Sequence, residues 1–148
     1  KTLEDLFDLD RNNYRVAIKI SENHIELDEF DSAYEWGSKA LKISKKNAES
    51  LSHMGNLYYK AMNACRGDNF SRSDKTVASL AYTYFTQAEK KGNSKYFKQK
   101  RWLEENDVLF GRADWFMLDK DIQVSGEVSP AGRCYDWVSE SLTKQSDW

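Results

Sequence analysis

The chain has 148 residues, of which 40% are hydrophobic and 31% are charged, a balance typical of one globular domain with its own core. The net charge of −2 and the lack of a basic stripe argue against a nucleic-acid partner. No apolar run approaches the roughly 20 residues that cross a bilayer, so we expect no membrane insertion. Because the chain starts at Lys1 without a signal-peptide pattern, we expect a mature chain or a domain excised from a longer protein.

The first part of the chain predicts a helical hairpin. A helix is expected over about residues 11–27, capped by Asp8 or Asp10, with apolar side chains at helical spacing. Asp28-Glu29 is the predicted turn. The second helix starts near Phe30 and carries small residues at helical spacing, which let two helices approach closely. These small residues are Ala33, Gly37 and Ala40.

A second hairpin is predicted after residue 47. Its first helix runs from Ala48 to about Cys65 and contains Gly55, which costs about 1 kcal/mol in a helix interior relative to alanine. We therefore expect Gly55 to lie against a neighbouring helix. The polar stretch 66–74 predicts a loop, and the next helix spans about residues 75–91, ended by Gly92-Asn93 as a C-cap.

The second hairpin is longer than the first. Ala81, Phe85 and Ala88 occupy the roles of Ala33, Gly37 and Ala40, and this spacing predicts an insertion over about residues 62–76.

The rest of the chain predicts a cap and an extension. A helix over residues 94–105 has one polar face and is expected to cover the last apolar surface. Residues 106–148 predict an aromatic-rich, irregular extension with a short β-hairpin, folded back on the helices. We expect Trp115 and Phe116 to be buried. Cys65 and Cys134 could form one bridge or remain buried thiols, and the sequence leaves both open.

Motifs for catalysis and metal binding are lacking. The only histidines are His24 and His53, and the chain contains no zinc, GxSxG or phosphate-loop pattern. We therefore predict no enzyme activity, no metal and no cofactor. Residues 66–68 read Arg-Gly-Asp and residues 69–71 form a glycosylation acceptor, but matches this short arise by chance. Both favour an exposed loop, in which Arg66 and Phe70 are candidate partner contacts.

The two hairpins are related by a period of 34 residues, since Tyr58 is equivalent to His24. Residues 14–93 resemble the tetratricopeptide repeat family. The first-helix core reads Gly55-Asn56-Leu57-Tyr58-Tyr59-Lys60, and the second-helix core is Phe30, Ala33, Ala40 and Leu41. The sequence departs from the family at Ala17, Ser21, Gly37 and Lys45.

The resemblance implies an all-α fold in which residues 1–105 form two repeats and a capping helix. It also implies a concave groove that binds a protein or peptide, as an adaptor or scaffold does. Mapped onto this chain, the groove exposes Arg15, Ile18, Glu22, Ile25, Glu26, Glu49, Ser52, Asn56, Tyr59 and Lys60. Only Asn56 matches the Lys, Arg and Asn set with which some members hold a C-terminal carboxylate, so we predict no such clamp.

Three other interpretations stay open. The groove residues could simply be solvated helix faces. The chain could be a non-catalytic accessory domain of a larger enzyme or surface protein, with its groove filled by residues 106–148. It could also bind carbohydrate or another ligand on coplanar, exposed tryptophan rings of the extension.

Overall fold

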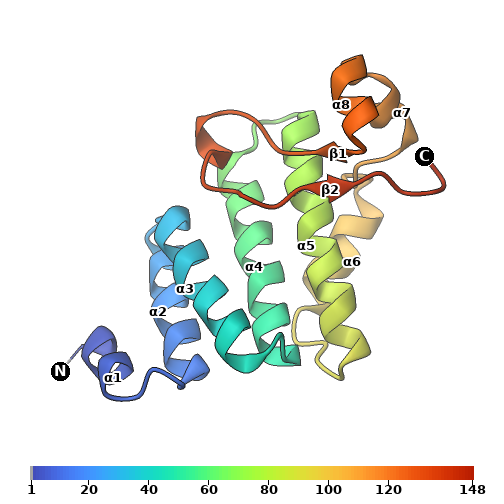
Figure 1. Ribbon diagram of the computed structural model, residues 1–148. Coiled ribbons are helices and arrows are strands. Elements are labelled where there is room, and N and C mark those ends of the chain that lie inside the picture. The colour runs from blue at the N-terminus through green and yellow to red at the C-terminus, as the bar shows by residue number, and fades with distance from the viewer. Residues whose placement is uncertain (1) are drawn as a thin grey trace.

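A computed structural model describes residues 2–148 as a mostly helical chain with one small antiparallel sheet (Figure 1). Four long helices stand side by side: α2 Tyr14–Glu26, α3 Phe30–Ser44, α4 Ala48–Cys65 and α5 Arg72–Lys90. The shorter helices α1 Leu3–Leu9 and α6 Phe97–Glu105 flank them. The predicted all-α fold with a short β-hairpin is confirmed, whereas membership of the tetratricopeptide repeat family stays a prediction.

Side-chain caps set where the long helices begin. The Asn13 side chain accepts a hydrogen bond from the Val16 amide at 3.3 Å, so α2 starts at Tyr14 and not near residue 11. The expected caps were wrong, because Asp8 lies within α1 and Asp10 ends it. Helix α1 was not predicted. Its seven residues span about two turns, too few for a clear periodic pattern.

Close helix contacts explain the two glycines inside helices. A Cβ atom added at Gly37 would lie 2.6 Å from the Met54 sulfur, so α3 and α4 meet at that point. A Cβ atom at Gly55 would lie 2.5 Å from the Phe85 ring, so α4 and α5 meet there. The expected contact of Gly55 with a neighbouring helix is therefore confirmed, and the main core lies along α4 and α5.

The extra length of the second hairpin lies mainly in its helices. Helices α4 and α5 have 18 and 19 residues, whereas α2 and α3 have 13 and 15. Helix α5 starts at Arg72, capped by Ser71, so the connecting loop covers only residues 66–71. The C-cap of α5 is Lys91, and Gly92, with a φ of 92°, follows it and ends the helix near the predicted position.

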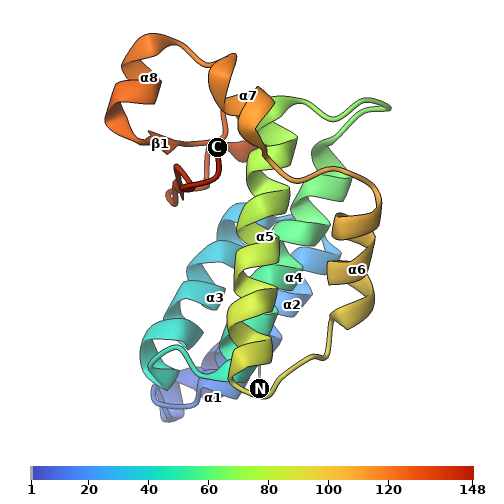
Figure 2. The same cartoon turned by 90° about the vertical axis from the view of Figure 1, so that its right-hand side faces the viewer.

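From β1 onward, the C-terminal extension passes across α3, α4 and α5, on the side away from α6 (Figures 1 and 2). Strand β1 (Glu127–Val128) pairs with β2 (Leu142–Thr143), and the 3₁₀ helix Arg133–Tyr135 lies in the long connection between them. Trp137 from this connection stacks on Tyr58 with ring centroids 5.9 Å apart. The aromatic side chain therefore fixes the extension to the middle of the helical layer.

Two short helices, α7 Arg112–Phe116 and α8 Lys120–Ser125, were also missed by the sequence analysis, again because of their length. Trp115 is buried as expected, but Phe116 is 60% exposed, so its predicted place in the core was wrong. None of the helices between residues 2 and 148 combines the length and hydrophobicity that a bilayer crossing needs.

Candidate functional site

A polar pocket of about 360 Å³ opens between α2, α4 and the segment that joins α5 to α6. Five of the predicted groove residues line it, and none of the lining residues comes from the C-terminal extension. The lining residues are Arg15, Ile18, Lys19, Glu22, Glu49, Ser52, His53, Asn93, Lys95 and Tyr96. We call this the α2–α4 pocket.

The rim of the α2–α4 pocket carries both signs of charge. Arg15 Nε lies 3.3 Å from Glu49 Oε1, and the Tyr14 hydroxyl donates a hydrogen bond to the same oxygen at 2.9 Å. This ion pair is exposed to solvent, so it contributes at most about 1 kcal/mol to stability. The Glu49 carboxylate thus already accepts from two donors. The other charged groups that line the pocket are the Lys19 and Lys95 ammonium groups and the Glu22 carboxylate.

One wall of the pocket is tied to α4 by hydrogen bonds. The Ser52 hydroxyl donates to Asn93 Oδ1 at 2.8 Å, and the Lys95 amide donates to the same oxygen at 3.1 Å. Residues 93–96 are thus held against α4, although they lie in a connection and not in a helix. This attachment positions Lys95 and Tyr96 at the pocket.

The floor of the pocket contains His53, which is 3% exposed. Its Nε2 lies 2.6 Å from the Ser21 hydroxyl, which donates its single hydrogen to the Ala33 carbonyl at 2.7 Å. Ser21 can therefore only accept from His53, so Nε2 carries the ring proton and Nδ1 is left as an acceptor. Among residues 2–148, His53 Nδ1 has no hydrogen-bond partner.

The His53 ring is neutral at pH 7. Burial lowers the pKa of His53 to about 4, and the nearby positive charge of Lys95 acts in the same direction. His53 therefore adds no charge to the floor of the pocket. Sequence analysis noted His53 only as a scarce residue, because nothing in its local pattern shows that its second nitrogen lacks a partner.

Four predicted groove residues are not exposed as expected. Ile18 and Ile25 are buried in the helix contacts, Ser52 is 2% exposed at the pocket wall, and Asn56 is 8% exposed. The hydrophobic effect favours burial of both isoleucines, although Ile18 still lines the pocket. Asn56 lies one turn beyond His53 on α4, and its Oδ1 also has no partner within the described part of the chain.

The far end of the predicted groove is covered by α6. The Tyr59 ring meets Trp102 edge-on at 6.0 Å and packs against Phe85, so Tyr59 is half-buried, and its role as a groove contact stays a prediction. Glu26 and Lys60 are exposed, but neither lines the pocket. The α2–α4 pocket is thus the hollow that five of the predicted groove residues share.

The loop between α4 and α5 folds onto α6 and does not extend freely. The Arg66 guanidinium lies 4.6 Å from the centre of the Phe70 ring, which packs against Trp102 at 6.2 Å. Phe70 is half-buried, and its role as a partner contact stays a prediction. Through their contacts with Trp102, Arg66 and Phe70 help to hold α6 against α4.

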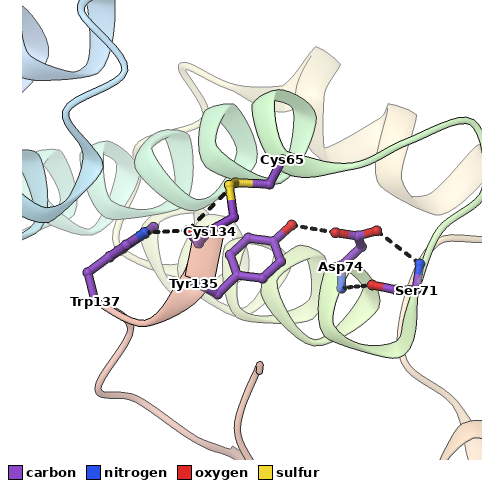
Figure 3. The surroundings of a disulfide bond; sticks show 6 residues. All are labelled: Cys65, Ser71, Asp74, Cys134, Tyr135 and Trp137. Carbon is purple, nitrogen blue, oxygen red and sulfur yellow. Dashed lines mark hydrogen bonds between the residues drawn. A yellow bond between two sulfur atoms is a disulfide. The ribbon is translucent and has the colours of Figure 1, made fainter. Parts of the chain in front are cut away.

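A disulfide joins Cys65 at the end of α4 to Cys134 in the extension, across 69 residues of sequence (Figure 3). Beside it, the Tyr135 hydroxyl donates to Asp74 at 2.5 Å, and Asp74 also accepts from the Ser71 amide at the start of α5. The bridge, which the sequence left open, therefore sits next to a hydrogen-bonded anchor on α5.

A second anchor of the extension is Glu140. Its carboxylate accepts hydrogen bonds from the hydroxyl groups of Tyr58 and Tyr84, the latter at 2.7 Å. Burial, with the negative charge of Glu140 second, raises the pKa of both tyrosines well above the usual range. Sequence analysis missed this contact, because 56 residues or more separate Glu140 from each partner.

The aromatic side chains near the C-terminus do not form a flat platform. Trp148 is half-buried, with its ring tilted by 44° to Phe110 and by 37° to Trp115. A second pocket, of about 500 Å³, lies between this cluster and α5. Within residues 2–148, no three His, Cys, Asp or Glu side chains gather so as to hold a metal ion.

Comparison of the chain with protein-family models, with curated proteins and with solved structures gave no match. The proposals that follow rest on the chemistry of pockets that the chain's own residues line.

Proposed function

We propose that this chain is a non-catalytic module that binds a protein or peptide through the α2–α4 pocket. The observation that carries the proposal is the position of the C-terminal extension. The extension covers the side formed by α3, α4 and α5, and it leaves open the α2–α4 pocket, which lies on the first helices of the two hairpins. An accessory domain with a filled groove would have the opposite arrangement.

The composition of the pocket also favours a peptide. Its lining offers charges of both signs, a hydroxyl and an amide within one concave site. Polypeptide ligands present donors, acceptors and charges at short intervals, so such a mixed lining suits them. The tilted, half-buried Trp148 gives no corresponding support to carbohydrate binding on exposed rings.

The disulfide supports a location in an oxidising compartment, where such bridges persist. In that setting the module would present the pocket on a helical layer cross-linked to its own extension. We therefore expect protein isolated from its native source to contain no free thiol.

A peptide library displayed on phage tests the proposal. Peptides selected on the wild-type chain are measured against the double variant Lys19→Glu, Lys95→Glu, which reverses two exposed charges at the pocket. The matched control is Lys42→Glu, Lys120→Glu, which makes the same charge change at exposed positions outside the pocket.

The proposal predicts that selected peptides lose at least about tenfold in affinity for the pocket variant and bind the control like the wild type. Peptides that bind both variants equally, or a library that yields no enriched sequence, would overturn it. Circular dichroism of both variants checks that the fold is retained.

A further inference from the structure

We propose that a hollow at one end of the helical layer binds the phosphate group of a phosphate monoester. The hollow has a volume of about 310 Å³ and lies where the turn between α3 and α4 meets the end of α5, at the lower end of Figure 1. Its lining residues are Lys46, Leu51, Gln87, Lys90 and Lys91, and we call it the lysine pocket. It shares no lining residue with the α2–α4 pocket, so the inference does not depend on the proposed function.

The lysine pocket carries positive charge that its own lining does not balance. Three of the five lining residues are exposed lysines, and none is an aspartate or a glutamate. Within residues 2–148, none of these lysines forms an ion pair. The Gln87 side chain adds an uncharged N–H donor. The lining therefore favours an anion.

The carboxylates near the lysine pocket have partners elsewhere. Glu89, which precedes Lys90, pairs with Lys100 at 2.7 Å. Glu140 lines a neighbouring hollow together with Lys46, but its carboxylate accepts hydrogen bonds from two tyrosine hydroxyl groups. The C-terminal ends of α3 and α5 each add only about half a negative charge. Three full positive charges outweigh these helix ends.

A hydrogen bond holds two sides of the lysine pocket together. The Lys91 ammonium donates to the Lys46 carbonyl at 2.7 Å, which joins the end of α5 to the turn between α3 and α4 (Figure 2). This contact uses one of the three N–H donors of Lys91 and leaves two for a ligand. The two lysines are thus held close together before a ligand arrives, which lowers the cost of binding.

The backbone of the turn between α3 and α4 also points to a function for its lysines. Lys45 and Lys46 both have the left-handed conformation, with φ angles of 56° and 58°. A residue with a Cβ atom is strained there, whereas glycine, asparagine and aspartate tolerate it. Among residues 2–148, every other residue with a positive φ is a glycine or an aspartate. Strain of this kind tends to be kept at functional positions.

The absence of arginine from the lining favours a phosphate group over a carboxylate. Arginine forms paired, planar contacts with carboxylates, whereas a lysine ammonium acts as a point charge and is a common phosphate ligand. A phosphate monoester carries a charge of about −1.5 to −2 at pH 7, so it matches three ammonium groups better than one carboxylate does. Soluble esters and lipid headgroups both carry this group, and the experiment separates the two sources.

Binding measurements on the full chain test the inference. Isothermal titration calorimetry uses glycerol phosphate, a soluble monoester, and a capped tetra-aspartate peptide, which supplies carboxylates. Vesicle sedimentation uses phosphatidylcholine with and without phosphatidic acid, whose headgroup is a phosphate monoester. The pocket variant is Lys46→Gln, Lys90→Gln. The matched control, Lys98→Gln, Lys120→Gln, removes the same charge at exposed positions outside the pocket.

At least one phosphate probe should bind the wild type, bind the pocket variant at least about tenfold more weakly, and bind the control like the wild type. Binding of glycerol phosphate assigns the site to a soluble ester, and binding of phosphatidic acid vesicles alone assigns it to a lipid headgroup. Affinity should fall below about pH 6, where the phosphate loses its second charge. Lys46→Gly should raise the Tm, because glycine relieves the strained turn, and should still weaken binding.

The inference fails if neither phosphate probe binds. It also fails if the tetra-aspartate peptide binds more tightly than both phosphate probes, which would indicate an acidic protein segment as the ligand. An equal loss of affinity in the pocket variant and the control would show an unspecific effect of net charge and would likewise overturn it. Circular dichroism checks that both variants keep the fold, and the library selection described above tests the α2–α4 pocket independently.

Discussion

Gly55→Ala should destabilise the protein, although alanine is the better helix former. The new methyl carbon would lie 2.5 and 2.6 Å from two carbons of the Phe85 ring, whereas carbon atoms in contact prefer about 3.5–4.0 Å. The helices or the ring would have to move by about 1 Å. Phe85 is 3% exposed and packs between Tyr59 and Tyr96, so the ring has no free space to enter.

The expected loss follows from two opposing effects. Overpacking of a core contact costs about 1–3 kcal/mol, and replacing glycine by alanine in a helix returns up to about 1 kcal/mol. We expect the free energy of unfolding to fall by about 1–2 kcal/mol, or the Tm to fall by about 3–6 °C for a chain of this size. Gly55→Leu, with more volume, should be worse.

Urea denaturation followed by circular dichroism measures the change. Gly67→Ala is the control, because a Cβ atom there meets nothing within 4 Å, and its effect should stay within about 0.5 kcal/mol. Adding Phe85→Leu should remove the cost of Gly55→Ala, which a double-mutant cycle would detect. If Gly55→Ala is as stable as the wild type, the close contact of α4 with α5 is wrong.

Three further predictions concern anchors and titration. Cys134→Ser should lower the free energy of unfolding by about 2–4 kcal/mol, because the bridge spans 69 residues. Dithiothreitol should destabilise the wild type by a similar amount and leave the variant unchanged. A wild type whose stability does not respond to dithiothreitol would refute this prediction. Tyr58 and Tyr84 have raised pKa values in the folded state, chiefly because they are buried, so their contribution is present below about pH 10 and is lost as the pH rises further. Ultraviolet titration should show at least two fewer tyrosines ionising near pH 11 in the folded protein than in the urea-unfolded protein, and equal numbers would refute this. Folding lowers the pKa of His53 from 6.5 to about 4, so the contribution of His53 to the free energy of unfolding is present above pH 6.5 and is lost as the pH falls toward 4, by about 3 kcal/mol in all. Denaturation at pH 7 and at pH 4.5 measures this loss. A stability that does not change with pH, as in His53→Leu, would contradict it.

The candidate site was only partly predictable. The resemblance to tetratricopeptide repeats placed Arg15, Glu22 and Glu49 on the first helices of the two hairpins, and all three residues line the pocket. The role of Lys95 was not predictable, since it enters the pocket through a connection that Asn93 ties to Ser52. The contact of Tyr59 with Trp102 was not predictable either, because it depends on how α6 docks against α4.

Local physics determined the long helices. The bounds of α3 and α4 agree with the sequence prediction because small and apolar residues recur there over four or five turns, and Gly55 signalled a close contact by its unfavourable helix propensity. A pattern of this length leaves little freedom in how a helix forms.

Only the tertiary structure decided how the extension docks. The Cys65–Cys134 bridge, the stacking of Trp137 on Tyr58 and the binding of Glu140 by two tyrosines join residues far apart in the chain. Such contacts depend on where whole helices come to lie, and no periodic pattern encodes them. The unpaired nitrogen of His53 belongs to the same class, because its state is set by a hydrogen-bond chain through Ser21 on α2 to Ala33 on α3.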